Sequence, residues 1–295
     1  MERKTAVVIG AVNMDICGRP NAKPRLRDSN PGVVSFSPGG VGRNIAHNLC
    51  LLGLNVKFVA AIGNDVYGQS IYSSCLSLGM DMSLCRRLDG MRTSSYLYVT
   101  DENNDMLIGV SDTDISASIT PEYLKKHLGE INSADAVVID ANLTAETLSW
   151  IADNVTRPLY ADPVSAAKSS RLLPAMHKLT AFKPNEYEAM SLTDADTPEG
   201  AAKALLSMGV KRAFVSLGRD GVIAAEGDEL IRLPCVTSEV INTTGCGDAA
   251  TAAMIWSGVH GLDLRHSAEA AMRASAMCAA CPLTVNPDLS AEKIK

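Results

Sequence analysis

The stretch Asn-Thr-Thr-Gly-Cys-Gly-Asp-Ala-Ala at 242–250 has the residue types and spacing of a reactive site, and a run of small residues suited to a helix follows it. A glycine-rich turn that leads into a helix leaves backbone N–H groups unpaired, and the helix dipole adds partial positive charge there. The amides of Gly245, Cys246 and Gly247 therefore predict an anion-binding site. Asp248, in the first helical turn, could accept a proton from a hydroxyl group that attacks a bound phosphoryl group. An ordinary loop-to-helix junction with an acidic first-turn residue has the same pattern.

A second glycine cluster, Pro-Gly-Gly-Val-Gly-Arg-Asn at 38–44, also leads into a helical pattern. Glycines such as Gly39 and Gly40 let the backbone approach a ligand closely, and Asn44 offers both a donor and an acceptor. The cluster is not the dinucleotide-binding G-x-G-x-x-G and lacks the lysine of a P-loop. A tight turn before a helix is the alternative interpretation.

Two polar residues, Asn13 and Asp15, follow the first apolar run. Their spacing of two predicts that they face the same side at the carboxyl end of a strand, which is where open α/β sheets bind ligands. An amide and a carboxylate there could hold two vicinal hydroxyl groups, as on a ribose. A solvated loop at a strand end would look the same.

Two further turns follow apolar strands. Asn185 and Glu188 form an N-x-x-E pattern at the start of a helix, which could hold a hydrated Mg²⁺ or could be a capping box. The turn that contains Ser216, Gly218 and Gly221 is compatible with nucleotide phosphates or with the entry to a hairpin.

The elements that must position these residues follow a regular alternation. Short apolar runs at 5–10, 55–63, 135–140, 158–163, 177–184 and 212–218 alternate with helical stretches. Thr120 and Thr197 each precede a proline, which is typical of a helix N-cap followed by proline at the first position. The pattern predicts a three-layer α/β domain with a mainly parallel sheet, and a late hairpin at 221–234 on the sheet margin.

Two segments interrupt the alternation, at about 11–36 and 91–111. The second has the pattern of a β-hairpin around a polar turn. We expect one domain over 1–295, with both segments forming a small β lid over the open end of the sheet, where it would exclude water. Thr93 is a candidate contact for a ligand beneath that lid.

The composition is that of a globular protein. The 295 residues are 46% hydrophobic and 20% charged, which excludes collagen, coiled coils and disordered chains. The net charge is −6 without a basic stripe, so we expect no nucleic-acid partner. We also expect no membrane partner and a cytoplasmic location, because the sequence has no signal-like segment and no run of about 18 apolar residues. Eight scattered cysteines predict reduced thiols.

Together and in this order, the motifs resemble the ribokinase-like (PfkB) family of carbohydrate and nucleoside kinases. The resemblance spans the whole chain and rests on the first strand with Asn13 and Asp15, GGVGRN, the N-x-x-E stretch, SLGRDG and TTGCGDA. It implies a three-layer α/β/α kinase that uses ATP and Mg²⁺. Residues 28–53 are most similar to members that phosphorylate the 5′-hydroxyl of pseudouridine, so the resemblance implies this nucleoside as substrate.

The resemblance also implies a role for each motif. Asp248 would be the catalytic base, and residues 245–247 would form the anion hole. Asn185 and Glu188 would serve Mg²⁺ and the phosphates. The ATP groove would be lined by the turn at 216–221 and the segment at 278–286. The ribose would be held by Asn13, Asp15, Gly39, Gly40 and Asn44. The lid of this family often doubles as a dimer surface, which implies a homodimer.

Several positions depart from the family pattern. Asn242 replaces an aspartate that commonly belongs to a monovalent-cation site, so the resemblance leaves potassium activation open. Asn142 stands where ribokinase has a sugar-contacting glutamate, and Val41 where it has a lysine, and both argue against free ribose as substrate. Cys246 replaces the more usual alanine. The alternatives are a kinase for uridine, inosine, adenosine or a sugar, or a non-catalytic ligand-binding homologue.

Overall fold

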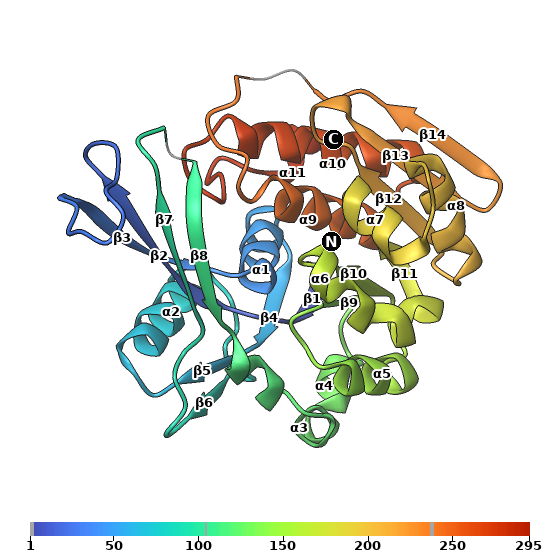
Figure 1. Ribbon diagram of the computed structural model, residues 1–295. Helices are drawn as coiled ribbons and strands as arrows, with labels where there is room; N and C mark the ends of the chain where they lie inside the picture. The colour runs from blue at the N-terminus through green and yellow to red at the C-terminus, as the bar shows by residue number, and fades with distance from the viewer. Residues whose placement is uncertain (1–2, 104, 237–238) are drawn as a thin grey trace.

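The computed structural model describes residues 3–103, 105–236 and 239–295. A central sheet is built from β1 (Thr5–Ile9), β4 (Asn55–Val59), β9 (Ala136–Asp140), β10 (Leu159–Asp162), β11 (Leu179–Phe182), β12 (Arg212–Ser216), β13 (Val222–Glu226) and β14 (Glu229–Leu233). Its strand order is β14-β13-β12-β11-β10-β9-β1-β4 (Figure 1). The pairs from β4 to β12 are parallel, and the β13–β14 hairpin is antiparallel at one edge. The predicted mainly parallel sheet is therefore confirmed.

Helices cover both faces of this sheet and give it three layers. Alternate residues of β1 enter separate cores, Ala6 and Val8 on one face and Val7 and Ile9 on the other, as the period of two in a strand requires. The first core includes residues of α1 (Val41–Leu51), α2 (Val66–Ser77), α9 (Cys246–Val259), α10 (Leu264–Ala279) and α11 (Ala291–Ile294). The second includes residues of α3 (Pro121–Lys126), α4 (Leu128–Ile131), α5 (Ala145–Asn154), η2 (Ser170–Lys178), α7 (Glu186–Thr193) and α8 (Pro198–Ser207).

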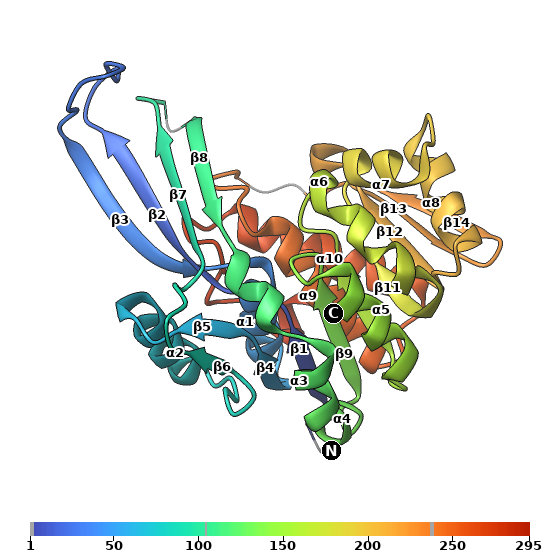
Figure 2. The same ribbon diagram turned by 60° about the horizontal axis from the view of Figure 1, so that its bottom comes forward.

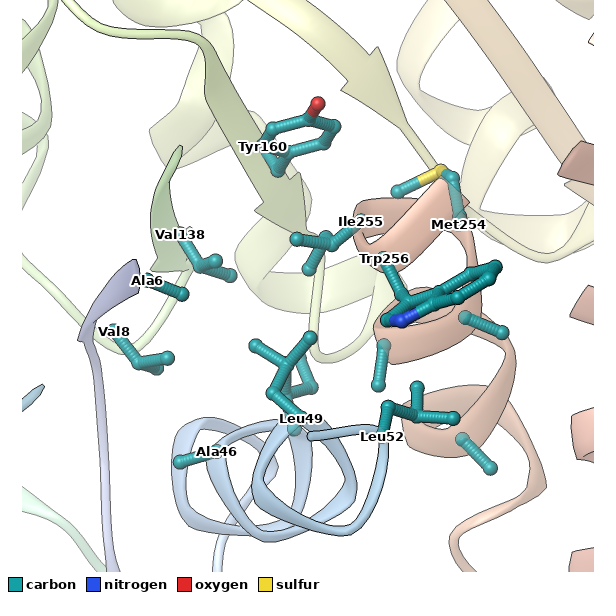
Figure 3. Packing of buried hydrophobic residues seen from close by; sticks show 14 of the residues in the cluster. Ala6, Val8, Ala46, Leu49, Leu52, Val138, Tyr160, Met254, Ile255 and Trp256 are labelled. Atoms are coloured by element: carbon teal, nitrogen blue, oxygen red, sulfur yellow. The ribbon is translucent and has the colours of Figure 1, made fainter. Parts of the chain in front are cut away.

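The packing of α1 on α9 brings the two glycine clusters together. Figure 3 shows Leu49 of α1 and Leu52, the C-cap of that helix, in the same cluster as Ile255 and Trp256 of α9. Burying a side chain of this size contributes about 1.5–3 kcal/mol, so the two helices are held firmly. Because α1 begins after Gly40 and α9 after Gly245, this core also fixes the distance between their first turns.

A second sheet projects from one side of the central sheet (Figures 1 and 2). It consists of β2 (Asn13–Pro20), β3 (Gly32–Gly39), β7 (Ser95–Thr100) and β8 (Met106–Asp112), in the order β3-β2-β7-β8. We call it the lid sheet. Its strands come from the two segments that interrupt the alternation of strands and helices, so both segments do form one small sheet.

One expected strand is divided. The run at 55–63 forms β4 and then a separate strand, β5 (Ala61–Gly63), which pairs with β6 (Arg86–Leu88). The reason lies in the backbone, because the Ala60 carbonyl accepts a hydrogen bond from the Arg86 amide and not from a strand of the central sheet. The chain therefore leaves the central sheet after Val59 to form this two-stranded ribbon.

The remaining elements are short, namely α6 (Ala166–Ser169), η1 (Asp114–Ser118) and η3 (Gly218–Asp220). Thr120 and Thr197 cap α3 and α8 through their side chains, as predicted. All eight cysteines are free thiols, also as predicted. Over the part of the chain that the structure describes, no helix combines the length and apolar character needed to cross a bilayer.

Candidate active site

The turn before α9 requires glycine at its last position. Gly245 has a φ of 86° and caps the helix through its backbone, and a Cβ here would lie 2.0 Å from the Thr284 carbonyl oxygen. Such a conformation and such a close contact are open only to glycine. The turn is therefore fixed by its backbone, as the sequence predicts for an anion site.

Not every amide of the turn is free. The Cys246 amide donates to the Thr243 carbonyl oxygen at 3.3 Å, so it is not one of the unpaired donors expected at residues 245–247. Among the described residues, no side chain caps α9 and no backbone carbonyl accepts from the amides of Gly247 and Asp248. The first turn of α9 therefore keeps unpaired donors and partial positive charge.

Asp248 is a buried carboxylic acid with one oxygen already held. Its residue is 9% exposed, and Oδ2 accepts a hydrogen bond of 2.8 Å from Nδ2 of Asn44. Burial, followed by the negative charge of Asp162, raises the pKa of Asp248 to about 8, although Asn44 and Lys183 act in the opposite direction. A raised pKa of this size is typical of groups that exchange protons in active sites.

Lys183 is a site residue to which the sequence interpretation gave no role. It follows β11, is 5% exposed, and its Nζ lies 3.5 Å from where a Cβ on Gly247 would be. The ammonium group therefore adds a full positive charge beside the first turn of α9. Its position directly after a buried parallel strand could have identified Lys183 from the sequence, because such strand ends meet at the ligand-binding edge of the sheet.

Two more carboxylates without a predicted role end neighbouring strands. Asp140 ends β9, and its oxygens accept from the Ala11 amide at 2.8 Å and the Asn142 amide at 2.9 Å. Burial raises the pKa of Asp140 to about 6. Asp162 ends β10 and accepts from the Thr251 hydroxyl at 3.0 Å. Both add negative potential at Asp248.

The glycine cluster at 38–44 packs against Asn13 and Asp15. A Cβ on Gly39 would lie 2.0 Å from Oδ2 of Asp15, and one on Gly40, whose φ is 99°, would lie 2.9 Å from Oδ1 of Asn13. Nδ2 of Asn13 donates to Oδ1 of Asp15, so the two side chains share a face as predicted. Their location is corrected, however, because they begin β2 of the lid sheet and do not end β1.

Asn44 connects the two glycine motifs. Its Nδ2 donates to Asp248 and its Oδ1 accepts from Nη1 of Arg43 at 3.2 Å. The prediction placed Asn44 on the ribose. The structure instead uses both ends of its amide within the protein, leaving one N–H for a ligand.

Comparison with known proteins identifies the architecture. The pfkB family carbohydrate kinase profile matches residues 3–291. The chain belongs to the PfkB family of carbohydrate kinases. It is therefore a phosphotransferase with an alcohol acceptor and a ribokinase-like fold, as the sequence predicts.

Individual relatives cover nearly the whole of this kinase. It is 38% identical to a pseudouridine kinase of Escherichia coli K12, over 98% of this chain and 95% of that protein. It is 34% identical to the uncharacterized sugar kinase YeiI of the same organism, over 99% of this chain and 82% of that protein. A ribokinase of Arabidopsis thaliana, solved with ribose and ATP, superposes with a TM-score of 0.86 at 21% identity, over 100% of this chain and 98% of that one, which shows the shared fold.

The N-x-x-E pattern of this kinase forms a capping box. Oδ1 of Asn185 accepts from the Glu188 amide at 2.9 Å, and Oε2 of Glu188 accepts from the Asn185 amide at 2.8 Å. The predicted capping box is therefore present, and within it Oε1 of Glu188 has no partner. Burial and the charge of Asp162 raise the pKa of Glu188, whereas the Asn185 amide and Lys183 lower it. A carboxylate near a second carboxylate suits a hydrated Mg²⁺, which needs few protein ligands.

The turn after β12 lies beside this capping box. The Ser216 amide donates to the Pro184 carbonyl oxygen at 3.0 Å. Asn185 and Ser216 form an isolated parallel β-bridge. Gly221 has a φ of 97°, and a Cβ there would lie 1.9 Å from a backbone carbonyl oxygen of the hairpin, whereas Gly218, with a φ of 57°, faces open space. Gly221 is thus required by the hairpin. A role of Ser216, Gly218 and Gly221 in ATP binding stays a prediction.

Two predicted substrate contacts have other partners. The Thr93 hydroxyl accepts from the Gly63 amide at 2.9 Å and donates to Oδ1 of Asp65, the N-cap of α2. Oδ1 of Asn142 accepts from Nζ of Lys168 at 2.7 Å. Thr93 therefore secures the start of α2, and we no longer expect it to contact a ligand beneath the lid. Asn142 keeps its amide N–H groups for a ligand.

Asn242 holds the turn before α9. Its Oδ1 accepts from the Thr244 amide at 3.0 Å, and its Nδ2 donates to the Pro282 carbonyl oxygen at 3.2 Å. An aspartate could not make the second bond, because a carboxylate has no N–H to donate. In the described residues, no group of three or more His, Cys, Asp or Glu side chains is arranged to hold a metal ion.

Proposed function

We propose that this protein is an ATP-dependent kinase that phosphorylates the 5′-hydroxyl group of pseudouridine. The observation that carries the proposal is the position of Asp248, whose buried carboxyl lies at the start of α9 beside the unpaired Gly247 amide and near Lys183. A proton acceptor and positive groups thus meet at one point, as in-line phosphoryl transfer requires. The 38% identity to a pseudouridine kinase supports this acceptor.

The residues divide the chemistry between them. Because Oδ2 of Asp248 is held by Asn44, its Oδ1 is the oxygen that accepts the proton of the 5′-hydroxyl group. The Lys183 ammonium and the Gly247 amide stabilise the charge on the migrating phosphoryl group. Glu188 would help to hold Mg²⁺, which would offset part of the charge of the ATP phosphates. Asn13 and Asp15 hold the ribose hydroxyl groups, and no covalent intermediate is required.

The side chains of the lid sheet favour a nucleoside over a free sugar as the substrate. In the register of β2 and β7, Asp15 pairs with Tyr96 and Cys17 with Tyr98, so these side chains share one face. The two tyrosine rings stack with centroids 5.5 Å apart. Burial, and then Cys17 and Asp15, raise the pKa of Tyr98 to about 12. A stacked aromatic pair beside a ribose-binding pair suits a nucleobase.

A second candidate is a kinase for another nucleoside or for a sugar, because the chain is 34% identical to the sugar kinase YeiI. Pseudouridine differs from uridine by an additional ring N–H group, and a buried acceptor for that group would discriminate strongly between them.

The decisive experiment measures ATP consumption with Mg²⁺ and pseudouridine, uridine, adenosine, ribose or fructose 6-phosphate at matched concentrations. We expect the highest kcat/KM with pseudouridine. In Tyr98→Leu, KM should rise for nucleosides and stay unchanged for ribose. A preference for another acceptor would overturn the proposed substrate alone, whereas no consumption with any acceptor would overturn the proposed chemistry.

We also propose that a second copy of the chain covers the outer face of the lid sheet. This face, opposite Asp15 and Tyr96, is lined by apolar side chains that are 44–61% exposed, namely Val34, Phe36, Leu97, Ile108 and Val110. A continuous apolar face of this kind is typical of a subunit interface. Sedimentation should show a dimer that Phe36→Asp dissociates, whereas Leu76→Asp on α2 should not. A monomeric wild type would refute the dimer.

A further inference from the structure

Arg43 is a buried cation to which the proposed phosphoryl transfer assigns no task. It lies in the first turn of α1 and is 8% exposed, and its Nε has no hydrogen-bond partner among the described residues. Burial lowers the pKa of Arg43, while Cys75 and the charge of Asp15 oppose that change. A buried cation with an unmet donor is costly unless its other contacts compensate.

Two hydrogen bonds connect Arg43 to Asp248 through the side chain of Asn44. Nη1 of Arg43 donates to Oδ1 of Asn44 at 3.2 Å, and Nδ2 of Asn44 donates to Oδ2 of Asp248 at 2.8 Å. All three residues are buried. The connection crosses from α1 to α9, between residues 204 positions apart in sequence.

The guanidinium group of Arg43 fixes the orientation of the Asn44 side-chain amide. A guanidinium can only donate hydrogen bonds, so the oxygen of the Asn44 amide must face Arg43 and its NH₂ group must face Asp248. In the flipped amide, NH₂ would face the guanidinium and the carbonyl oxygen would face the carboxylate. Both contacts would be repulsive, so Arg43 determines which end of Asn44 reaches Asp248.

We propose that Arg43 is a positioning residue that acts through Asn44 to hold Oδ2 of the catalytic base, so that Oδ1 of Asp248 faces the acceptor hydroxyl. The proposal rests on the proposed role of Asp248 as the base. It differs from a role of Arg43 in substrate binding, where its charge would act on Asp15 and the ribose. Loss of a positioning residue lowers kcat and leaves KM nearly unchanged. Loss of a substrate-binding residue raises KM and leaves kcat nearly unchanged.

The surroundings of Asp248 give the sign of a second readout. The charged and titratable groups that face it are Asp140 from β9, Asp162 from β10, Lys183 after β11 and the Cys278 thiol from α10. From α1, the group in contact is the Asn44 amide, which lowers the pKa of Asp248 by donating to its ionised form. Loss of that donor raises the pKa, so the acid limb of the kcat profile moves to higher pH.

The experiment is a double-mutant cycle with Arg43→Met and Asn44→Ala, in which kcat, nucleoside KM and the kcat–pH profile are measured with the preferred acceptor. We expect each single variant to lower kcat about tenfold, to keep KM within about twofold, and to move the acid limb upward. Because Arg43 acts through Asn44, the double variant should be no slower than Asn44→Ala alone. Arg43→Lys keeps the charge beside Asp15 without the planar fork and should also lose kcat.

Arg212→Met is the matched control, because Arg212 is a partly buried arginine at the opposite end of the central sheet, bonded to Leu262 and Glu226. It should leave kcat and the pH profile unchanged. Additive effects in the cycle, or a raised KM with unchanged kcat in Arg43→Met, would overturn the proposal.

A wild type that does not phosphorylate pseudouridine would refute the proposed substrate and leave the Arg43 proposal open to a direct test. Carbon-13 NMR of the Asp248 carboxyl group in the ligand-free protein reports its titration without any turnover. A raised pKa in Arg43→Met and Asn44→Ala supports the proposal. Should Arg43→Met not fold, the same titration is followed in Arg43→Lys. An unchanged titration in the folded variants overturns it.

Discussion

Replacing Asp248 by asparagine tests two properties of one carboxyl group. The amide has nearly the same shape and can still accept a hydrogen bond from Asn44, but it cannot take up a proton and carries no charge. A positioned general base contributes about 10²- to 10⁴-fold, so we expect kcat to fall by at least about a hundredfold. The nucleoside KM should stay within a few-fold of wild type, because the base acts in the transition state.

The same change should stabilise the fold, by an amount that grows with pH. Burial, assisted by the charge of Asp162, raises the pKa of Asp248 from 3.8 to about 8. Between these values the folded protein keeps a proton that the unfolded chain releases. The wild type therefore loses about 1.4 kcal/mol of unfolding free energy for each pH unit of increase. Asparagine does not titrate, so its advantage should grow by about 3 kcal/mol from pH 5 to pH 7.

Urea unfolding of the ligand-free wild type and variant at pH 5, 6 and 7 measures this difference, and a coupled ATP assay measures kcat. Asp153→Asn, at an exposed position on α5, is the matched control and should change neither quantity. A stability difference that is the same at pH 5 and pH 7 would refute the buried neutral acid. Turnover within a few-fold of wild type would refute the general base.

Three further substitutions examine the surroundings of the base. Gly245→Ala should cost about 1–3 kcal/mol in urea unfolding and lower kcat, because φ is 86° and a Cβ would meet a carbonyl oxygen at 2.0 Å; an unchanged midpoint would contradict this. Asp162→Asn should move the acid limb of kcat/KM to lower pH, because the charge of Asp162 raises the pKa of Asp248, and an unmoved limb counts against it. Asn242→Asp replaces the donor to the Pro282 carbonyl with a second oxygen, so kcat should become potassium-dependent, whereas wild type should be equally active in potassium and choline chloride.

The parts of the fold and of the site that depend on local backbone conformation could be predicted from the sequence. Gly40 and Gly245 precede helices at positive φ, where a side chain would also collide with a neighbour. A requirement of this kind is visible as a glycine at a fixed place in a motif. The caps Thr120 and Thr197 depend on three or four adjacent residues, and they were predictable for the same reason.

The parts that could not be predicted depend on residues distant in sequence. Asn44 is a plausible ribose ligand by its motif, and nothing local shows that its amide faces Asp248 across 204 positions. Thr93 lies in a lid segment, yet its hydroxyl is bonded to Asp65 because the chain returns beside α2. Lys183 has a recognisable strand-end position, but which ligand group it approaches depends on where α9 packs.

The packing of α1 against α9 therefore has a chemical consequence as well as a structural one. The Asn44–Asp248 hydrogen bond measures 2.8 Å, and a displacement of several tenths of an ångström would weaken it considerably. Three residues of α9, Ala249, Ala252 and Ala253, have small side chains and are all buried. Small side chains allow the close approach that this bond requires, and cores are packed densely enough to maintain it. The same residues that build the core thus determine the distance at which the proposed base is held.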